Sequence, residues 1–247
     1  SAAAATPAIY LAGNTGTAAD GNETGRIIKL GNLSGTPQAA FNTTTTPDSG
    51  VSTAQATVVD ANGNVYVVGN TTGSFGGQIE KGDQDVYLTK YDSAGNVQWT
   101  RLLGSQSSAS GYSLALDPTG GVVVAGSTTG PLSQNAIGGG TDSFVAKYSG
   151  DGTQKWLHQL DPVSNDTALA VTVDASGNVY YGGQVNGPIA SGQTRVGGLD
   201  GYITKLDNKG SVVSRQQGGT TGTDQVSQMA TTADGGLVVA SVQNGHA

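Results

Sequence analysis

The sequence has no cysteine, only two histidines and little charge. Without cysteine, the chain can form neither a disulfide nor a thiolate metal site. The histidines, His158 and His246, do not stand at the spacing of paired zinc ligands. Apolar runs are also short, and none approaches the roughly 18 residues that a membrane-spanning helix needs. We therefore expect no zinc site and no membrane insertion.

Basic residues are scarce as well. Eleven Lys and Arg stand against 18 Asp and Glu, so the net charge of −7 repels phosphate backbones and argues against nucleic acid as a partner. Charged residues make up only 12% of the chain, whereas disordered chains combine low hydrophobicity with high charge. The 40 glycines and the many Thr and Asn indicate a folded, turn-rich protein. This composition is typical of exported bacterial proteins, so we expect an extracellular or cell-surface location.

What the sequence does contain is a long internal repeat. Asp60, Asp117, Asp174 and Asp234 each begin a similar segment, at separations of 57, 57 and 60 residues. Residues 60–69 read Asp-Ala-Asn-Gly-Asn-Val-Tyr-Val-Val-Gly, in which the aspartate and the glycine predict a hairpin turn. The repeat predicts one array over residues 1–247, with units at approximately 9–53, 54–110, 111–167, 168–225 and a partial unit at 226–247.

Each unit contains four short β-favouring segments separated by turn signals. In the second unit they are Ala54 to Val59, Val65 to Gly69, Val86 to Tyr91 and Val97 to Leu103. Segments such as Val122-Val-Val-Ala125 are apolar on both faces, so both faces must be covered. No useful helical periodicity is present, and sheets must therefore cover sheets. The pattern predicts an all-β fold: a β-propeller of four-stranded blades, with about four units, incomplete or part of a larger ring.

The first and last units are unfinished. The pattern enters at the second strand of a unit, at Ile9, and leaves after the second strand of the last unit, Leu237 to Val242, which gives seventeen strands. Open strand edges are hazardous unless they are paired. We therefore expect these residues to belong to a longer chain, or the terminal strands to pair with a neighbouring copy in a filament or surface layer.

Eight residues recur at fixed places and form the predicted structural set: Asp85, Lys90, Trp99, Asp142, Lys147, Trp156, Asp200 and Lys205. A catalytic lysine would be needed once, so a lysine in every unit predicts a structural role. Its stem would pack between blades and its ammonium would meet a carboxylate or carbonyls. The three aspartates of the set are the carboxylates to test, on the same or a neighbouring blade.

The tryptophans stand where the fourth strand begins, and we expect them to be packing residues. Ser214 is the vacant third position, and Phe41 stands in for the aromatic of the first unit. A ligand-stacking role for the tryptophans is the alternative. Asp60-x-Asn62-x-Asn64 alternates oxygen ligands as calcium loops do, but it lacks their acidic run, so a plain turn is favoured over a calcium site.

The recurring motifs carry a family resemblance. Asp-x-x-Gly-Asn-Val-Tyr-Val-x-Gly, then Asp-x-(Tyr/Phe)-x-x-Lys, then Gly-x-x-x-Trp resembles the bacterial β-propeller repeat family abbreviated SBBP, over most of residues 9–240. The resemblance implies an exported β-propeller and says little about activity. Such repeats occur in large bacterial surface proteins and in proteins linked to flagella.

These observations favour a noncatalytic structural or interaction module of an exported bacterial surface or appendage protein, whether filament, flagellar or surface-layer. No catalytic, cofactor-binding or metal-binding residue is singled out. The expected partners are other protein chains, either copies of this one or the rest of a larger protein. Two alternatives stay open. A carbohydrate-binding propeller predicts aromatic side chains in shallow pockets repeated in each blade, and a hydrolase requires a converging acidic cluster in a central channel.

Overall fold

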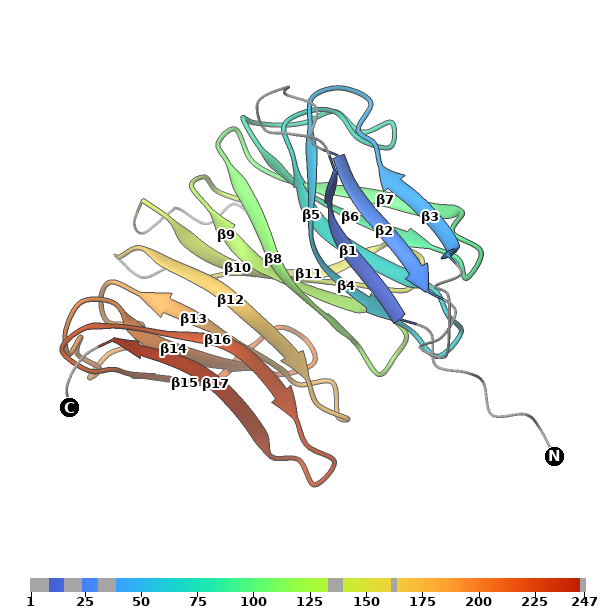
Figure 1. Ribbon diagram of the computed structural model, residues 1–247. Coiled ribbons are helices and arrows are strands. Elements are labelled where there is room, and N and C mark those ends of the chain that lie inside the picture. The colour runs from blue at the N-terminus through green and yellow to red at the C-terminus, as the bar shows by residue number, and fades with distance from the viewer. Residues whose placement is uncertain (1–8, 16–23, 31–38, 133–139, 161–163, 245–247) are drawn as a thin grey trace.

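The computed structural model describes residues 9–15, 24–30, 39–132, 140–160 and 164–244, and this part of the chain contains no helix, so none that could cross a membrane. It contains seventeen strands (Figure 1). They are β1 (Ile9–Thr15), β2 (Thr24–Leu30), β3 (Ala39–Thr45), β4 (Ser52–Val59), β5 (Val65–Thr71), β6 (Asp85–Tyr91), β7 (Val97–Leu103), β8 (Ala109–Leu116), β9 (Val122–Thr128), β10 (Asp142–Tyr148), β11 (Gln154–Gln159), β12 (Asp166–Val173), β13 (Val179–Val185), β14 (Asp200–Leu206), β15 (Val212–Gly218), β16 (Thr223–Thr231) and β17 (Leu237–Asn244).

The strands form five antiparallel sheets in chain order. The first sheet is β1–β3, the second β4–β7, the third β8–β11, the fourth β12–β15, and the C-terminal sheet is β16–β17. Within each sheet every strand pairs with its neighbour in sequence, so the sheets are simple meanders. Figure 1 shows them fanned face to face, with the first and C-terminal sheets at opposite ends of an open arc. The predicted all-β propeller fold with four-stranded blades is confirmed, and the ring is not closed.

The core lies between successive sheets because each sheet is apolar on both faces. Tyr87 of the second sheet packs toward Ile27 of the first. On the opposite face of the second sheet, Val86 and Leu88 pack against Phe144 of the third sheet. A similar cluster joins the third and fourth sheets. At about 25 cal/mol for each Å² of apolar surface removed from water, these interfaces are the main favourable contribution to stacking.

The turns follow the predicted chemistry. Asp60 Oδ1 accepts hydrogen bonds from the backbone N–H groups of Asn62 and Asn64, each at 2.9 Å. Gly63 closes the turn with a φ of 78°, a conformation that glycine adopts without steric cost. The same arrangement recurs at Asp174, which accepts from Ser176 and Asn178. These tight turns set the register of the hairpins that follow.

Candidate functional site

Each recurring lysine lies directly across the sheet from the recurring aromatic position. Four cross-strand pairs share this register: Lys29 with Phe41, Lys90 with Trp99, Lys147 with Trp156, and Lys205 with Ser214. A register shift follows each lysine, and such a β-bulge bends the strand locally. The register places Phe41 at the tryptophan position of the first unit and Ser214 at the tryptophan position of the fourth.

In the second sheet, the lysine and the tryptophan reach the same carbonyl of the third sheet. Lys90 Nζ and Trp99 Nε1 each donate a hydrogen bond of 3.0 Å to the carbonyl oxygen of Gly150, in the turn between β10 and β11. The ammonium of Lys90 also lies 5.2 Å from the ring centroid of Tyr66, a cation–π distance. Tyr66 in turn meets Trp99 edge to face at 6.0 Å. Lys90 and Trp99 therefore bind the β10–β11 turn of the third sheet.

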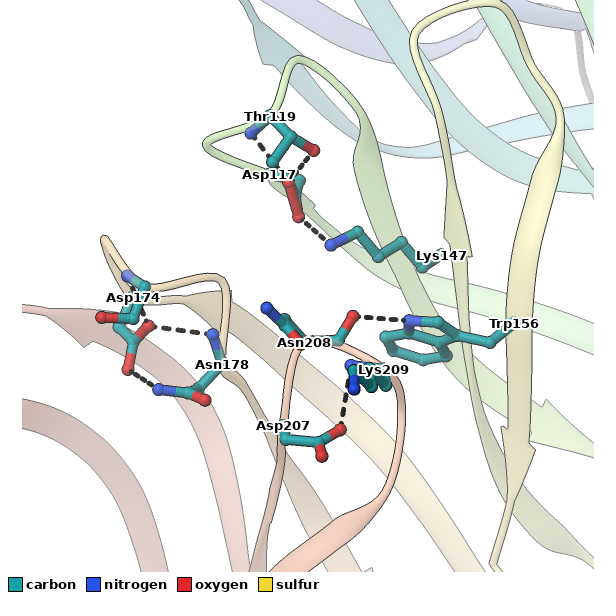
Figure 2. Close-up of polar contacts among 10 residues, drawn as sticks. Asp117, Thr119, Lys147, Trp156, Asp174, Asn178, Asp207, Asn208 and Lys209 are labelled. Atoms are coloured by element: carbon teal, nitrogen blue, oxygen red, sulfur yellow. Dashed lines mark hydrogen bonds and ion pairs between the residues drawn. The ribbon is translucent and has the colours of Figure 1, made fainter.

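In the third sheet the two side chains have separate partners (Figure 2). Trp156 Nε1 donates to the carbonyl oxygen of Asn208, in the β14–β15 turn, at 3.2 Å. Lys147 forms an ion pair with Asp117, at the end of β8 in the same sheet. Burial raises the pKa of Asp117, but the hydrogen bonds from Lys147 and Thr119 outweigh that effect and hold this pKa below its usual value.

In the fourth sheet the lysine has an aromatic neighbour and no tryptophan opposite it. Lys205 Nζ lies 5.0 Å from the ring centroid of Tyr180, and the hydrogen bond with Tyr180 raises the pKa of the lysine. Ser214 is exposed. The C-terminal sheet has no third and fourth strands within the described residues, so it presents no turn where Gly150 and Asn208 lie in the other sheets.

Glycines in the β10–β11 and β14–β15 turns leave room for the tryptophan rings of the preceding sheet. Gly152 has a φ of 83°, and a Cβ built there would lie 2.8 Å from the ring of Trp99. Gly210 has a φ of 86°, and its Cβ would lie 2.8 Å from the ring of Trp156. The glycine of this turn therefore serves both the backbone conformation and the contact between blades.

The aspartates that begin each third strand have partners other than the lysines five residues later. Asp85 Oδ2 accepts from the backbone N–H of Lys81, Asp142 Oδ2 accepts from Gln159 Nε2, and Asp200 accepts from Val196 N–H and Gln217 Nε2. Among the described residues, the ion pair that a recurring lysine forms is that of Lys147 with Asp117. The sequence did not single out Asp117 for this role. The carboxylates hold the loop before the strand or the end of the fourth strand.

One further carboxylate is buried between the third and fourth sheets. Asp166, 2% exposed, begins β12 and accepts a 2.8 Å hydrogen bond from Ser143 N–H through Oδ1. Its Oδ2 has no hydrogen-bond partner among the described residues. Burial, with a contribution from the nearby Asp142, raises the pKa of Asp166 to about 7, while Arg215 and the Ser143 hydrogen bonds act in the opposite direction.

His158 of β11 lies in the same interface. Burial, with the positive charge of Arg215, lowers the pKa of His158 to about 4, so its imidazole is neutral at physiological pH. The ring meets that of Tyr181 edge to face at 6.2 Å. Within the described ranges, no group of three or more His, Asp or Glu side chains is placed to hold a metal ion.

Shallow grooves recur between the first hairpin turns of neighbouring sheets. One, of about 450 Å³, is lined by Asp60, Asn62, Lys90 and Asp117. Another, of about 300 Å³, lies between the turns at Asp174 and at residues 231–235. Their linings contain Asp, Asn, Ser and Thr and no aromatic side chain. The oxygens of Asp60 that a calcium ion would need already accept hydrogen bonds from Asn62 and Asn64.

Comparison with known families bears directly on this arrangement. Residues 98–133, which run from β7 through β8 and β9, match the family model described as SBBP, beta-propeller repeat. This segment is an SBBP repeat. The match confirms, over these residues, the resemblance inferred from the recurring motifs. The matched residues include Trp99 and run from the second sheet into the third.

Two relatives share part of the array. The chain is 30% identical over 217 residues to Regulatory protein FlaEY of Caulobacter vibrioides, covering 80% of this chain and 23% of that protein. It is 28% identical over 125 residues to the uncharacterized WD repeat-containing protein L264 of Acanthamoeba polyphaga mimivirus, covering 42% of this chain and 9% of that protein. The chain thus spans less than a quarter of either relative.

A solved structure with a similar arrangement is the major allergen Mala s 1 of Malassezia sympodialis. It is 12% identical, with a TM-score of 0.42, over 87% of this chain and 80% of that chain.

Proposed function

We propose that the SBBP array is a noncatalytic structural and interaction module that binds other protein chains, within an exported bacterial surface or appendage protein. Its recurring side chains support this proposal. Lys90, Trp99 and Trp156 make contacts between blades, and their repetition is what a stacked scaffold needs. A regulatory protein among the relatives is compatible with a role in protein contacts.

The observation that carries the proposal is the exposed apolar face of the C-terminal sheet. Val238 is 58% exposed and Val242 is 42% exposed. Val238 has the place in β17 that Tyr66 has in β5 and Val123 has in β9, and those two residues are at most 1% exposed. Surfaces of this kind mark interaction sites when they are contiguous. Another protein chain, or a further blade of the same larger protein, would bury the side chains that are exposed on this face.

Sedimentation velocity and hydrogen exchange test the proposal. The purified chain is expected to self-associate as its concentration rises, with slow amide exchange in β17 only in the associated state. The double variant Val238→Asp, Val242→Asp should remain a monomer. Ile79→Asp is a matched control, because Ile79 is 80% exposed in a loop of the second sheet. A wild-type chain that stays monomeric with a protected β17 would contradict the proposal.

Carbohydrate binding is the second candidate, favoured by the recurrence of the polar grooves between hairpin turns. Hydroxyl-rich ligands suit Asp, Asn and Lys side chains, although the aromatic platforms expected for a lectin do not line these grooves. A glycan array would test it, with Asn62→Ala as the variant expected to remove binding. Unchanged binding by this variant would place any glycan elsewhere on the surface. A hydrolase ranks last, because it requires a single converging cluster of acidic groups, whereas the recurring residues of this chain are repeated from unit to unit.

A further inference from the structure

The interface between the third and fourth sheets is more polar than the interface before it. Toward the second sheet, the third sheet presents the buried apolar side chains of Ala109, Val124, Phe144 and Ala146. At the same four register positions, the fourth sheet has Asp166, Tyr181, Tyr202 and Thr204. All four are at most 2% exposed, so the interface contains buried oxygen atoms that need hydrogen-bond partners.

Three neighbouring oxygen atoms in this interface have no such partner among the described residues. They are Asp166 Oδ2, the Tyr202 hydroxyl and Ser143 Oγ of the third sheet. Ser143 is fully buried, as Tyr202 and Asp166 nearly are. A buried polar group without a hydrogen bond costs its full desolvation penalty, so native proteins satisfy nearly all such groups, in part with ordered water. These atoms therefore call for a partner that the described residues do not supply.

The second sheet shows how the chain satisfies polar groups at the same positions. Ser52, at the register position of Asp166, accepts a hydrogen bond from the N–H of Gly25 at 3.3 Å. Thr89, at the register position of Thr204, bonds to the hydroxyl of Thr100 at 3.0 Å. Polar residues at these positions therefore do not by themselves lead to unpaired atoms.

The three unpaired oxygen atoms belong to side chains that lie close together. The N–H of Ser143 donates to Asp166 Oδ1 at 2.8 Å, which places these two residues in contact across the interface. Burial, with the charge of Asp166, raises the pKa of Tyr202, whereas the nearby side chain of Ser143 acts in the opposite direction. Ser143 also has the register position of Val86 in the second sheet, so the third sheet presents a smaller side chain here.

We propose that the interface between the third and fourth sheets binds an internal water molecule, held by Ser143 Oγ, the Tyr202 hydroxyl and Asp166 Oδ2. A buried water typically makes about three hydrogen bonds to polar groups that are otherwise unsatisfied. Water and both hydroxyls can each donate or accept, so the three bonds form whether or not the carboxyl is protonated. The water joins the third sheet to the fourth, and this role does not depend on the proposed function.

The first test is a high-resolution crystal structure of the whole chain. It is expected to show a water oxygen at about 2.7–3.2 Å from each of the three atoms. A direct hydrogen bond between the hydroxyls of Ser143 and Tyr202, with no density between them and Asp166, would overturn the inference. Density at about 2.4 Å from the oxygen atoms would also overturn it, because that is the distance of a bound cation.

The second test counts long-lived internal water in solution by magnetic relaxation dispersion of the water oxygen nucleus, which exchanging hydroxyl protons do not affect. The double variant Ser143→Ala, Tyr202→Phe keeps one of the three partners and should lose one long-lived water. Tyr87→Phe is the matched control, because Tyr87 has the register position of Tyr202 in the second sheet, and the water beside Asp166 should remain. An unchanged count in a double variant with native near-ultraviolet circular dichroism would contradict the inference. If that variant does not fold, the wild-type crystal structure decides.

Discussion

Replacing Asp166 by asparagine isolates the energetic effect of a buried carboxyl between two blades. The asparagine Oδ1 can still accept the hydrogen bond from Ser143 N–H, so the geometry of the interface is retained. The variant removes the ability to ionise and places an amide NH2 group at the position of Oδ2, and the effect of that group on stability does not depend on pH. Because burial raises the pKa of Asp166 to about 7, the wild-type carboxyl stays protonated in the folded chain over a pH range where the unfolded chain has lost that proton.

The sign and size of the effect follow from this difference. Between pH 3.8, the ordinary pKa, and about 7, the unfolded state binds fewer protons, so the wild-type free energy of unfolding falls as pH rises. Each pKa unit corresponds to about 1.4 kcal/mol, so the asparagine variant should gain up to about 4 kcal/mol relative to wild type across this range. Above about pH 7 the difference should be constant.

Urea denaturation followed by tryptophan fluorescence, at pH values from about 4 to 8, measures the difference between variant and wild type. The wild-type profile alone is a poor readout, because the pKa of His158 is lowered to about 4 and its effect on stability has the opposite pH dependence. Asp151→Asn is the control, since the pKa of exposed Asp151 lies below its usual value and the group stays ionised throughout. A variant-minus-wild-type difference that does not change with pH would refute the reasoning.

Two further predictions concern the contacts between strands and blades. Lys147→Met leaves Asp117 buried without its cation and should lower the free energy of unfolding by about 3 kcal/mol, measured by urea denaturation. Adding Asp117→Asn should recover part of this loss. A double variant no more stable than Lys147→Met would argue against the ion pair. Gly152→Ala should destabilise the chain more than Gly120→Ala, by roughly 1 kcal/mol or more, because both positions have positive φ but only the first places a Cβ against Trp99. Equal losses of stability in the two alanine variants would mean that the Trp99 ring moves aside from the added methyl group at little energetic cost.

Much of the fold could be predicted because its signals are local and repeated. The Asp-x-x-Gly turns act within four residues, and both-face hydrophobicity at Val122 to Ala125 requires that sheets cover both sides. The expected strands of the second unit differ from β4, β5, β6 and β7 by at most two residues at an end. The incomplete first and last sheets were predicted from the count of seventeen strands.

The partners of the recurring residues were harder to predict. Lys90 and Trp99 both meet a backbone carbonyl, that of Gly150, and a backbone acceptor leaves no trace in side-chain patterns. Asp117 was visible as a turn residue, but its ion pair with Lys147 joins the end of β8 to β10 across the sheet, and no spacing in the sequence indicates that pairing. The raised pKa of Asp166 has no sequence signal, because it arises from burial between two sheets.

The contacts of β7 and β11 with the turn of the following sheet give the array a direction. Trp99 and Trp156 both point along the chain toward the next unit, and the carbonyls they meet, at Gly150 and Asn208, occupy the same place in their turns. The third unit could therefore be deleted without losing this contact, since Trp99 would meet the carbonyl of the Asn208 turn where it now meets that of Gly150. Loss of the third unit by unequal recombination would thus leave a junction of the same kind, whereas a duplicated fourth unit would lack the tryptophan contact, because Ser214 occupies that position.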